Sequence, residues 1–313
     1  MTHCRRDGGS EVPTRQSIIA LPTEIISGVL HKGSVMINGG GAKTNKTFAL
    51  MDMALSVASG SAWWDNQTVA GKVLYVDFEL SEQFWKNLLD RIVQEKGITQ
   101  EQLRNLDVWN LRGHAADIDV LRDEILHRLS TTNYSLIIVD PIYKVLGDRD
   151  ENSAGDITSM MNVFEKMAVD SGAAIVLGHH FSKGNQAGKE AMDRVSGSGV
   201  FSRSPDALVT ITRHEQRDIY AVEMTLRHLR SPEPFCVQWE YPMMVRAVDL
   251  DPTKLKRGGG GQPKFDKNAF LALLNPTPLT TKEWKERAMA ELHMSDGTFG
   301  TYKRTAANAN KVH

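Results

Sequence analysis

The chain has 313 residues, 41% of them hydrophobic and 24% charged, with a formal net charge of -1, which is typical of globular proteins and excludes a disordered or fibrous one. No apolar run approaches the roughly 18 residues of a membrane-spanning helix, and residues 1–16 lack the apolar stretch of a signal peptide. Two cysteines, Cys4 and Cys236, are too few for a disulfide framework or a four-cysteine metal site, so we expect a cytoplasmic protein without a membrane partner.

Short apolar runs alternate with segments of helical periodicity through the first half of the chain. Strands are predicted at 34–38, 72–77, 106–110, 135–139 and 173–178, and helices at 47–59, 82–95, 118–129 and 157–170. Strands that are apolar on both faces and separated by helices predict an α/β fold with a parallel sheet covered on both sides. Further strands at 206–212, 219–226, 235–240 and 243–248 are joined by short turns and predict antiparallel additions at the sheet edge.

A glycine-rich stretch divides the chain. Residues 253–266 contain four consecutive glycines and no apolar periodicity, which is typical of a linker. We therefore expect a polar arm at 1–20, a main domain at 21–252, the linker at 253–266 and a small module at 267–313.

The first predicted strand runs into the sequence GGGAKTNKT at 39–47, directly before a helix. In a phosphate-binding loop, glycines let backbone N–H groups converge on the phosphates, a lysine neutralises them and a hydroxyl holds Mg²⁺. Asn45 stands where this pattern usually has its last glycine, and asparagine is the residue that best tolerates the left-handed backbone. The alternative is a glycine-rich turn with a solvent-facing lysine. The candidate residues for binding ATP are Gly39, Gly40, Gly41, Ala42, Lys43, Thr44, Asn45, Lys46, Thr47 and Phe48.

Carboxylates follow two of the buried strands. Asp140 ends the run SLIIVD and can reach Mg²⁺ through water, or else it caps a turn. Asp77 and Glu79 lie two residues apart, so both can face the nucleotide. Glu79 has the longer reach and is the candidate base that polarises the attacking water, whereas Asp77 is a candidate metal residue with a structural salt bridge as the alternative.

Two histidines, His179 and His180, follow the strand at 173–178. Adjacent residues on a strand point to opposite faces, so one histidine is expected to sense the γ-phosphate and the other to pack. Zinc is not expected, because no Cys, His or carboxylate spacing completes a shell.

The segments VLYVDFELS, LDVWNLRGH, LIIVDPIYKV and VLGHHFSKG, together with the glycine-rich loop, resemble AAA-type ATPases of the RecA-like superfamily. The nearest group is the plasmid RepA hexameric replicative helicases and their relatives on phages and mobile elements, over residues 20 to 245. The resemblance implies a RecA-like P-loop core in a homo-oligomer, expected to be a hexamer. It assigns phosphate and Mg²⁺ binding to Lys46 and Thr47, the base to Glu79, the Walker B acid to Asp140, and the sensor to His179 or His180.

The resemblance also implies an arginine that reaches the nucleotide of a neighbouring subunit. Arg227 and Arg230 are the candidates, which of them is the finger stays open, and a solvated pair of surface arginines is the alternative. The segment 181–198 matches the loop that faces the channel of such rings, so Lys183, Lys189 and Arg194 are candidates for contact with single-stranded DNA. A mobile loop with scattered charge is the alternative there.

The carboxyl-terminal tail is basic, with 11 Lys and Arg against 5 Asp and Glu over residues 253–313, a local +6 that leaves -7 on residues 1–252. Helical spacing at 267–274 and 281–292, a short turn, and a third helix with Lys303 and Arg304 predict a helix-turn-helix that binds duplex DNA. The alternative is a packing module that contacts the ATPase core or a protein partner.

These features together predict a nucleic-acid-stimulated ATPase that acts as a ring-shaped replicative DNA helicase. A DNA-binding regulator that uses ATP as a switch with little turnover, favoured by Asn45 and the tail, is the first alternative. A RecA-type recombination ATPase that forms filaments is the second.

Overall fold

The computed structural model describes residues 21–114, 117–181, 189–194, 198–256, 266–274 and 279–308. The predicted arm at 1–20, residues 257–265 of the predicted linker, and Lys183 lie outside the described residues. The chain divides into two compact units, Met1–Arg257 and Gly258–His313, and each is described by itself.

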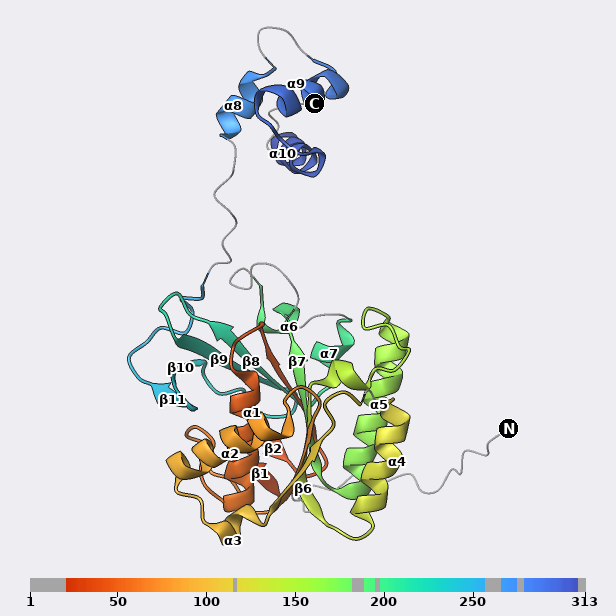
Figure 1. The fold of residues 1–313 in the computed structure, drawn as a ribbon, viewed down its shortest axis with the longest axis vertical. Helices are drawn as coiled ribbons and strands as arrows, with labels where there is room; N and C mark the ends of the chain where they lie inside the picture. Colours follow the sequence, from red (N-terminus) through yellow and green to blue (C-terminus); the bar gives the residue numbers. More distant parts are fainter. Residues whose placement is uncertain are drawn as a thin grey trace, which may run out of the picture. The chain divides into compact units, whose positions relative to one another are not determined.

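A nine-stranded sheet organises the described part of the first unit (Figure 1). Its order is β11-β10-β9-β8-β3-β7-β6-β4-β5. The strands from β8 to β5 in this order are parallel, and β9, β10 and β11 extend the β8 edge in antiparallel fashion, as the sequence predicts. The bounds are β3 Val35–Gly40, β4 Lys72–Asp77, β5 Leu106–Asn110, β6 Tyr134–Asp140, β7 Ala174–His180, β8 Ala207–Arg213, β9 Ile219–Leu226, β10 Phe235–Glu240 and β11 Met243–Ala247.

Helices cover both faces of the sheet because its strands are apolar on both faces. Along β4, Val73 and Tyr75 pack in the core on the α1 side, whereas Leu74 and Val76 pack in the core that contains residues of α4 and α5. Figure 1 shows α1, α2 and α3 on one face and α4 and α5 on the other. The bounds are α1 Lys46–Ser59, α2 Glu82–Lys96, α3 Gln100–Leu103, α4 Ile118–Leu129 and α5 Ala154–Ser171.

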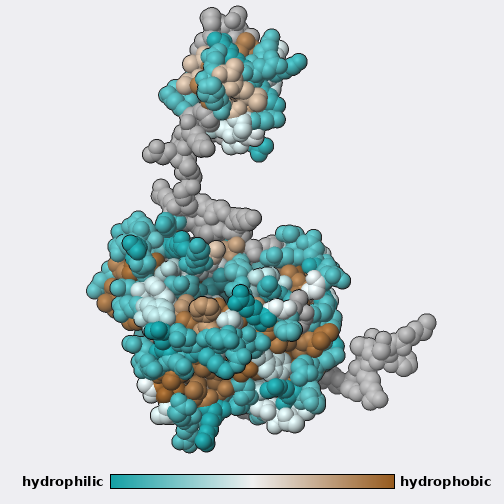
Figure 2. Space-filling view, viewed as in Figure 1, coloured by the Kyte–Doolittle hydropathy of each residue, from teal (hydrophilic) through white to brown (hydrophobic). Residues whose placement is uncertain are grey.

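Short elements complete the unit. A two-stranded antiparallel sheet precedes β3, a 3-10 turn follows β6, and two short helices lie between β7 and β8. They are β1 Glu24–Ile26, β2 Leu30–His31, η1 Ile142–Val145, α6 Ala191–Arg194 and α7 Val200–Arg203. The surface shown in Figure 2 is mainly hydrophilic, interrupted by several hydrophobic areas. Among the described residues, no helix is long and apolar enough to cross a membrane.

The parallel register brings the carboxyl ends of four strands to one edge of the sheet. Gly40 of β3 pairs with His180 of β7, and Asp77 of β4 pairs with Asp140 of β6. Residues far apart in the sequence therefore meet where the chain leaves these strands, which is where ligands bind in open α/β sheets.

The second unit is built from three described helices, α8 Lys267–Ala272, α9 Thr281–Glu291 and α10 Asp296–Asn308. Phe270, Trp284 and Phe299 are at most 3% exposed and form the centre of its core. The Trp284 Nε1–H donates to the Phe270 carbonyl at 3.2 Å. Thr280 and Glu283 form the capping box that starts α9.

Candidate phosphate-binding and hydrolytic site

The loop between β3 and α1 needs a glycine at position 40. A Cβ there would lie 2.6 Å from Thr44 Oγ1 and 2.8 Å from the Lys46 side chain, so no larger residue fits without moving the loop. Asn45 has a φ of 58°, which confirms the left-handed backbone expected of it. No side chain caps the first turn of α1, so its backbone N–H groups can receive an anion.

Lys46 is the first residue of α1, and its side chain lies against this loop and is 7% exposed. Its Nζ donates to the Gly40 carbonyl at 3.0 Å and the Gly41 carbonyl at 3.3 Å, and it lies 2.9 Å from His180 Nδ1. Burial lowers the pKa of Lys46, while the negative charges of Asp140 and Glu79 oppose this shift. An anionic ligand beside the amine would further stabilise its charged form.

Asp140, at the end of β6, is 2% exposed. Burial raises its pKa, and hydrogen bonds from Tyr75 and Thr47 oppose the rise; the Tyr75 hydroxyl donates to Oδ2 at 2.9 Å. The carboxylate at the end of β6 lies beside the Thr47 hydroxyl in the first turn of α1. This pair fits the donor set of Mg²⁺, which prefers few protein oxygens and takes the rest from phosphates and water. Thr47 and Asp140 are therefore the residues that would hold this cation.

Glu79 and His180 face each other across the pocket. The Glu79 Oε1 accepts from the Tyr143 hydroxyl at 3.2 Å and lies 3.9 Å from His180 Nε2. The neighbouring His180 lowers the pKa of Glu79, burial opposes this, and Tyr143 and Lys46 lower it further. His180 thus links the loop lysine to a carboxylate that is held in its ionised, proton-accepting form.

Asp77 shapes the turn that carries Glu79. It is fully buried, and its oxygens accept from the backbone N–H groups of Glu79 at 3.1 Å and Leu80 at 3.1 Å and from the Asn110 side chain at 2.9 Å. Burial raises its pKa to about 6. The geometry therefore favours the structural alternative for Asp77 over a metal contact, although its bonds are to amides instead of to a cationic side chain.

The two histidines diverge as adjacent strand residues should. His179 is 1% exposed, and its ring packs 4.3 Å from the Phe201 ring, away from Lys46. His180 alone of the pair lines the pocket beside the loop. His180 is thus the sensor candidate, and His179 has the packing role.

One pocket of about 230 Å³ brings most of the candidate residues together. It lies at the carboxyl ends of the strands and against the first turn of α1. Its lining consists of Lys43, Thr44, Asn45, Lys46, Thr47, Phe48, Glu79, Leu80, Leu88, Asp140 and His180. Lysine, hydroxyl, carboxylates and imidazole in one cavity can bind a phosphate chain, hold a cation and accept a proton from water.

The two arginine candidates lie elsewhere. Leu226, the last residue of β9, pairs with Ala207 at the beginning of β8, and the Arg227 N–H donates to the Asp206 carbonyl at 2.9 Å. Arg227 and Arg230 are exposed. They lie near the amino-terminal ends of the parallel strands, whereas the glycine-rich loop lies at the carboxyl ends. Neither arginine is among the residues that line the pocket of their own chain.

The candidates for nucleic-acid contact differ in their surroundings. Arg194 is only 7% exposed, and its guanidinium pairs with Glu223 at 3.0 Å, so the prediction of a nucleic-acid contact from Arg194 is corrected. Lys189 is partly buried, and the Lys303 Nζ donates to Thr281 Oγ1 at 2.9 Å. Arg304 is exposed on α10.

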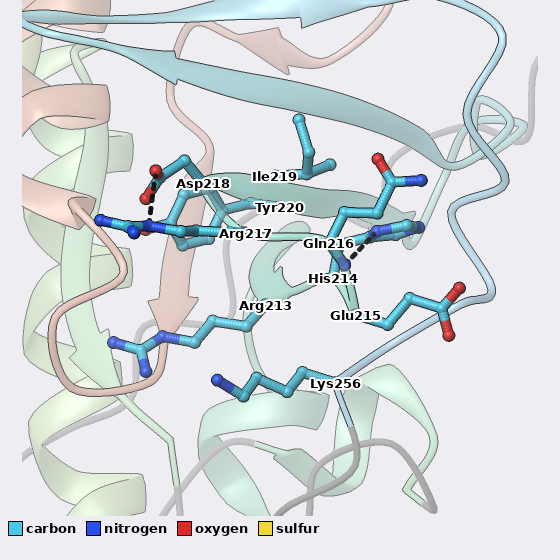
Figure 3. Close-up of a pocket in the computed structure, with 9 residues that line it drawn as sticks. All are labelled: Arg213, His214, Glu215, Gln216, Arg217, Asp218, Ile219, Tyr220 and Lys256. Atoms are coloured by element: carbon cyan, nitrogen blue, oxygen red, sulfur yellow. Dashed lines mark hydrogen bonds and ion pairs between the residues drawn. The ribbon is translucent and has the colours of Figure 1, made fainter.

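Three further residues contact the site although no sequence motif points to them. Tyr143 reaches Glu79 from η1, and Arg213 and Tyr220 reach the glycine-rich loop from the β8–β9 hairpin (Figure 3). They are distant in sequence from the motifs and follow no recognisable spacing, although Tyr143 lies three residues after Asp140.

A family model for an AAA domain, AAA_25, matches residues 11–186. The DNA repair protein RadA of Campylobacter jejuni subsp. jejuni serotype O:2 is 25% identical over 175 residues, which cover 55% of this chain and 34% of RadA. This chain thus spans about one third of the length of that relative. The solved structure titled ATPase Domain of G40P matches with a TM-score of 0.52 at 11% identity, over 69% of this chain and 86% of that chain, which shows a shared fold.

These comparisons support a RecA-like P-loop ATPase core. The matched residues include the glycine-rich loop, Glu79, Asp140 and both histidines. Because the family model covers more than half of the chain, the protein belongs to the AAA domain family AAA_25.

Proposed function

We propose that the protein hydrolyses ATP with Mg²⁺, is stimulated by single-stranded DNA, and works as a ring-shaped replicative DNA helicase. The observation that carries the proposal is the single pocket that joins Lys46, Thr47, Asp140, Glu79 and His180. Family membership supports nucleotide binding, and the similarity to a protein named for DNA repair supports a nucleic-acid substrate.

The phosphate chain would lie in the loop at 40–47. Backbone N–H groups at the start of α1 and the Lys46 amine would contact its oxygens, replacing the present bonds of that amine to the Gly40 and Gly41 carbonyls. Bound Mg²⁺, held by Thr47 and through water by Asp140, would neutralise charge on the phosphates.

Glu79 orients the attacking water and accepts its proton. Its carboxylate stays ionised because His180 and Tyr143 lower its pKa. His180 lies between Glu79 and Lys46. The loss of the γ-phosphate beside Lys46 would therefore shift His180, and this shift would move the chain that follows β7.

The position of Arg227 and Arg230 supports an assembly of copies. They lie at the opposite ends of the strands from the pocket of their own chain, but they could contact the pocket of a neighbouring copy arranged head to tail. Such heterologous contacts form a ring when the rotation between neighbours closes and a filament when it does not. We propose the closed form, a hexamer.

DNA contact is proposed for two places. Lys189 would contact single-stranded DNA in the ring channel. The same contact is proposed for Lys183, which lies outside the described residues. The second unit, through Lys303 and Arg304 of α10, would bind duplex DNA or a protein partner.

The test is steady-state ATP hydrolysis by the full chain, with and without single-stranded DNA. We expect turnover that rises with DNA and is lost in Lys46→Ala but kept in Lys32→Ala, which removes an exposed lysine outside the pocket. Tight ATP binding with no turnover in either condition would contradict the helicase and leave the ATP-switched DNA-binding regulator.

A further inference from the structure

The β8–β9 hairpin contacts the phosphate-binding loop through one cross-strand pair. Arg213, the last residue of β8, pairs in register with Tyr220 of β9. The Arg213 Nη2 donates to the Lys43 carbonyl at 2.9 Å and the Ala42 carbonyl at 3.4 Å. The Asn45 side-chain amide donates to the Tyr220 hydroxyl at 3.3 Å. Two neighbouring side chains therefore hold the loop at two points.

The loop needs such support because two of its non-glycine residues have left-handed backbones. Lys43 and Asn45 each have a φ of 58°, a conformation that persists only where the surroundings enforce it. The Asn45 side chain does not cap α1 and is turned toward Tyr220 instead. The residue that replaces the usual glycine thus gains a partner that glycine could not have.

The hairpin itself is firmly fixed. The His214 N–H donates to the Ile219 carbonyl at 3.0 Å, and the Lys256 N–H donates to the Arg213 carbonyl at 2.8 Å. His214 is 1% exposed, and its Nε2 lies 3.0 Å from the Asp251 carbonyl oxygen. Arg213, His214 and Lys256 line a pocket of about 370 Å³, and Figure 3 shows the side chains of Arg213 and Lys256 extending in the same direction.

We propose that Arg213 and Tyr220 form a clamp that holds the phosphate-binding loop in the conformation that receives the phosphates. They are positioning residues, and the identity of the ligand as ATP rests on the proposed function. A loop ordered before binding loses less conformational entropy when the ligand arrives, so the clamp acts on affinity. In the described part of the chain, neither Arg213 nor Tyr220 contacts Glu79, His180 or Asp140, so we expect the clamp to leave the hydrolysis rate of the bound complex unchanged.

The first test is a double-mutant cycle on the dissociation constant of Mg²⁺-ATP, measured by calorimetric titration of the full chain. Tyr220→Phe is expected to weaken binding about 2- to 10-fold, the effect of one hydrogen bond, with kcat unchanged. In an Asn45→Gly background, Tyr220→Phe should not change the affinity, because the side-chain amide that donates to the Tyr220 hydroxyl is already absent. An equal loss in both backgrounds, or none in either, would overturn the proposal.

The second test compares two substitutions with the same change of charge. Arg213→Gln removes the bonds to the loop carbonyls, whereas Lys256→Gln removes a cation that lines the same pocket. We expect Arg213→Gln to weaken ATP binding roughly tenfold, as for a lost charge-assisted hydrogen bond. Lys256→Gln should leave the affinity unchanged. Equal losses of affinity in the two variants would mean that the pocket acts through its positive charge alone and would overturn the clamp.

A third measurement separates this proposal from the proposed function. Hydrogen exchange of the amides at 41–46, without nucleotide, should speed up in Tyr220→Phe and Arg213→Gln and stay unchanged in Lys256→Gln. Faster exchange in a protein that binds no ATP would refute the proposed function and retain the clamp. Unchanged exchange in both variants would refute the clamp, whatever the protein binds.

Discussion

At the scale of single residues, the environment of Glu79 explains how a half-exposed carboxyl can be a base. His180, Tyr143 and Lys46 all favour its charged form, and burial opposes them without reversing the net fall in its pKa. The base thus remains deprotonated well into the acidic range, and hydrolysis should decline only at low pH.

The role of Tyr143 gives a pH prediction. In Tyr143→Phe the ring is kept and the hydrogen bond to Glu79 is lost, so the carboxyl pKa rises and the acidic limb of the kcat/KM profile moves to higher pH. At neutral pH we expect at most a roughly fivefold fall in kcat, as for one hydrogen bond. Tyr134→Phe, which loses a hydroxyl that donates to Asp107, is the control with an unmoved limb. A limb that stays in place in Tyr143→Phe would contradict this account.

At the scale of elements, the β3–loop–α1 unit depends on the close approach of Lys46 to Gly40. In Gly40→Ala the new Cβ meets Thr44 and Lys46, so the loop must shift, and we expect at least tenfold weaker ATP binding by titration. Gly155→Ala is the matched control, since the nearest atom to its Cβ is 3.9 Å away. Unchanged binding in Gly40→Ala would show that the phosphates do not lie in this loop.

The long elements are predictable because their patterns are strong. The strands Lys72–Asp77, Leu106–Asn110, Ile219–Leu226 and Phe235–Glu240 and the helix Ile118–Leu129 have the predicted bounds. The short pieces β1, β2, α3, α6, α7 and η1 hold too few residues to show a period.

Side-chain partnerships are harder to predict than elements. The loop motif and Asp140 follow known spacings, so the centre of the site is readable from the sequence. The bonds from Arg213 and Tyr220 to the loop span 170 and 175 residues, and only the order of strands brings them together. The burial of Arg194 against Glu223 likewise depends on a contact between separate elements, which a count of basic residues in a loop cannot reveal.

At the scale of the whole molecule, the opposite placement of pocket and arginines predicts complementation between inactive variants. Lys46→Ala and the double variant Arg227→Ala, Arg230→Ala should each be nearly inactive. Mixed in equal amounts, they should recover about a quarter of the wild-type rate, because random assembly in a ring joins an intact pocket to intact arginines at that frequency. ATP turnover after mixing measures this. Activity that remains at the sum of the separate variants would contradict a site shared between copies.

Single-turnover hydrolysis by Glu79→Gln shows whether Glu79 is the base of an ATP-hydrolysing pocket. We expect this variant to bind Mg²⁺-ATP with unchanged affinity but to hydrolyse it at least about 100-fold more slowly than the wild type. Glu95→Gln, an exposed glutamate on α2, should behave as wild type. Hydrolysis at the wild-type rate by Glu79→Gln would show that Glu79 is not the base.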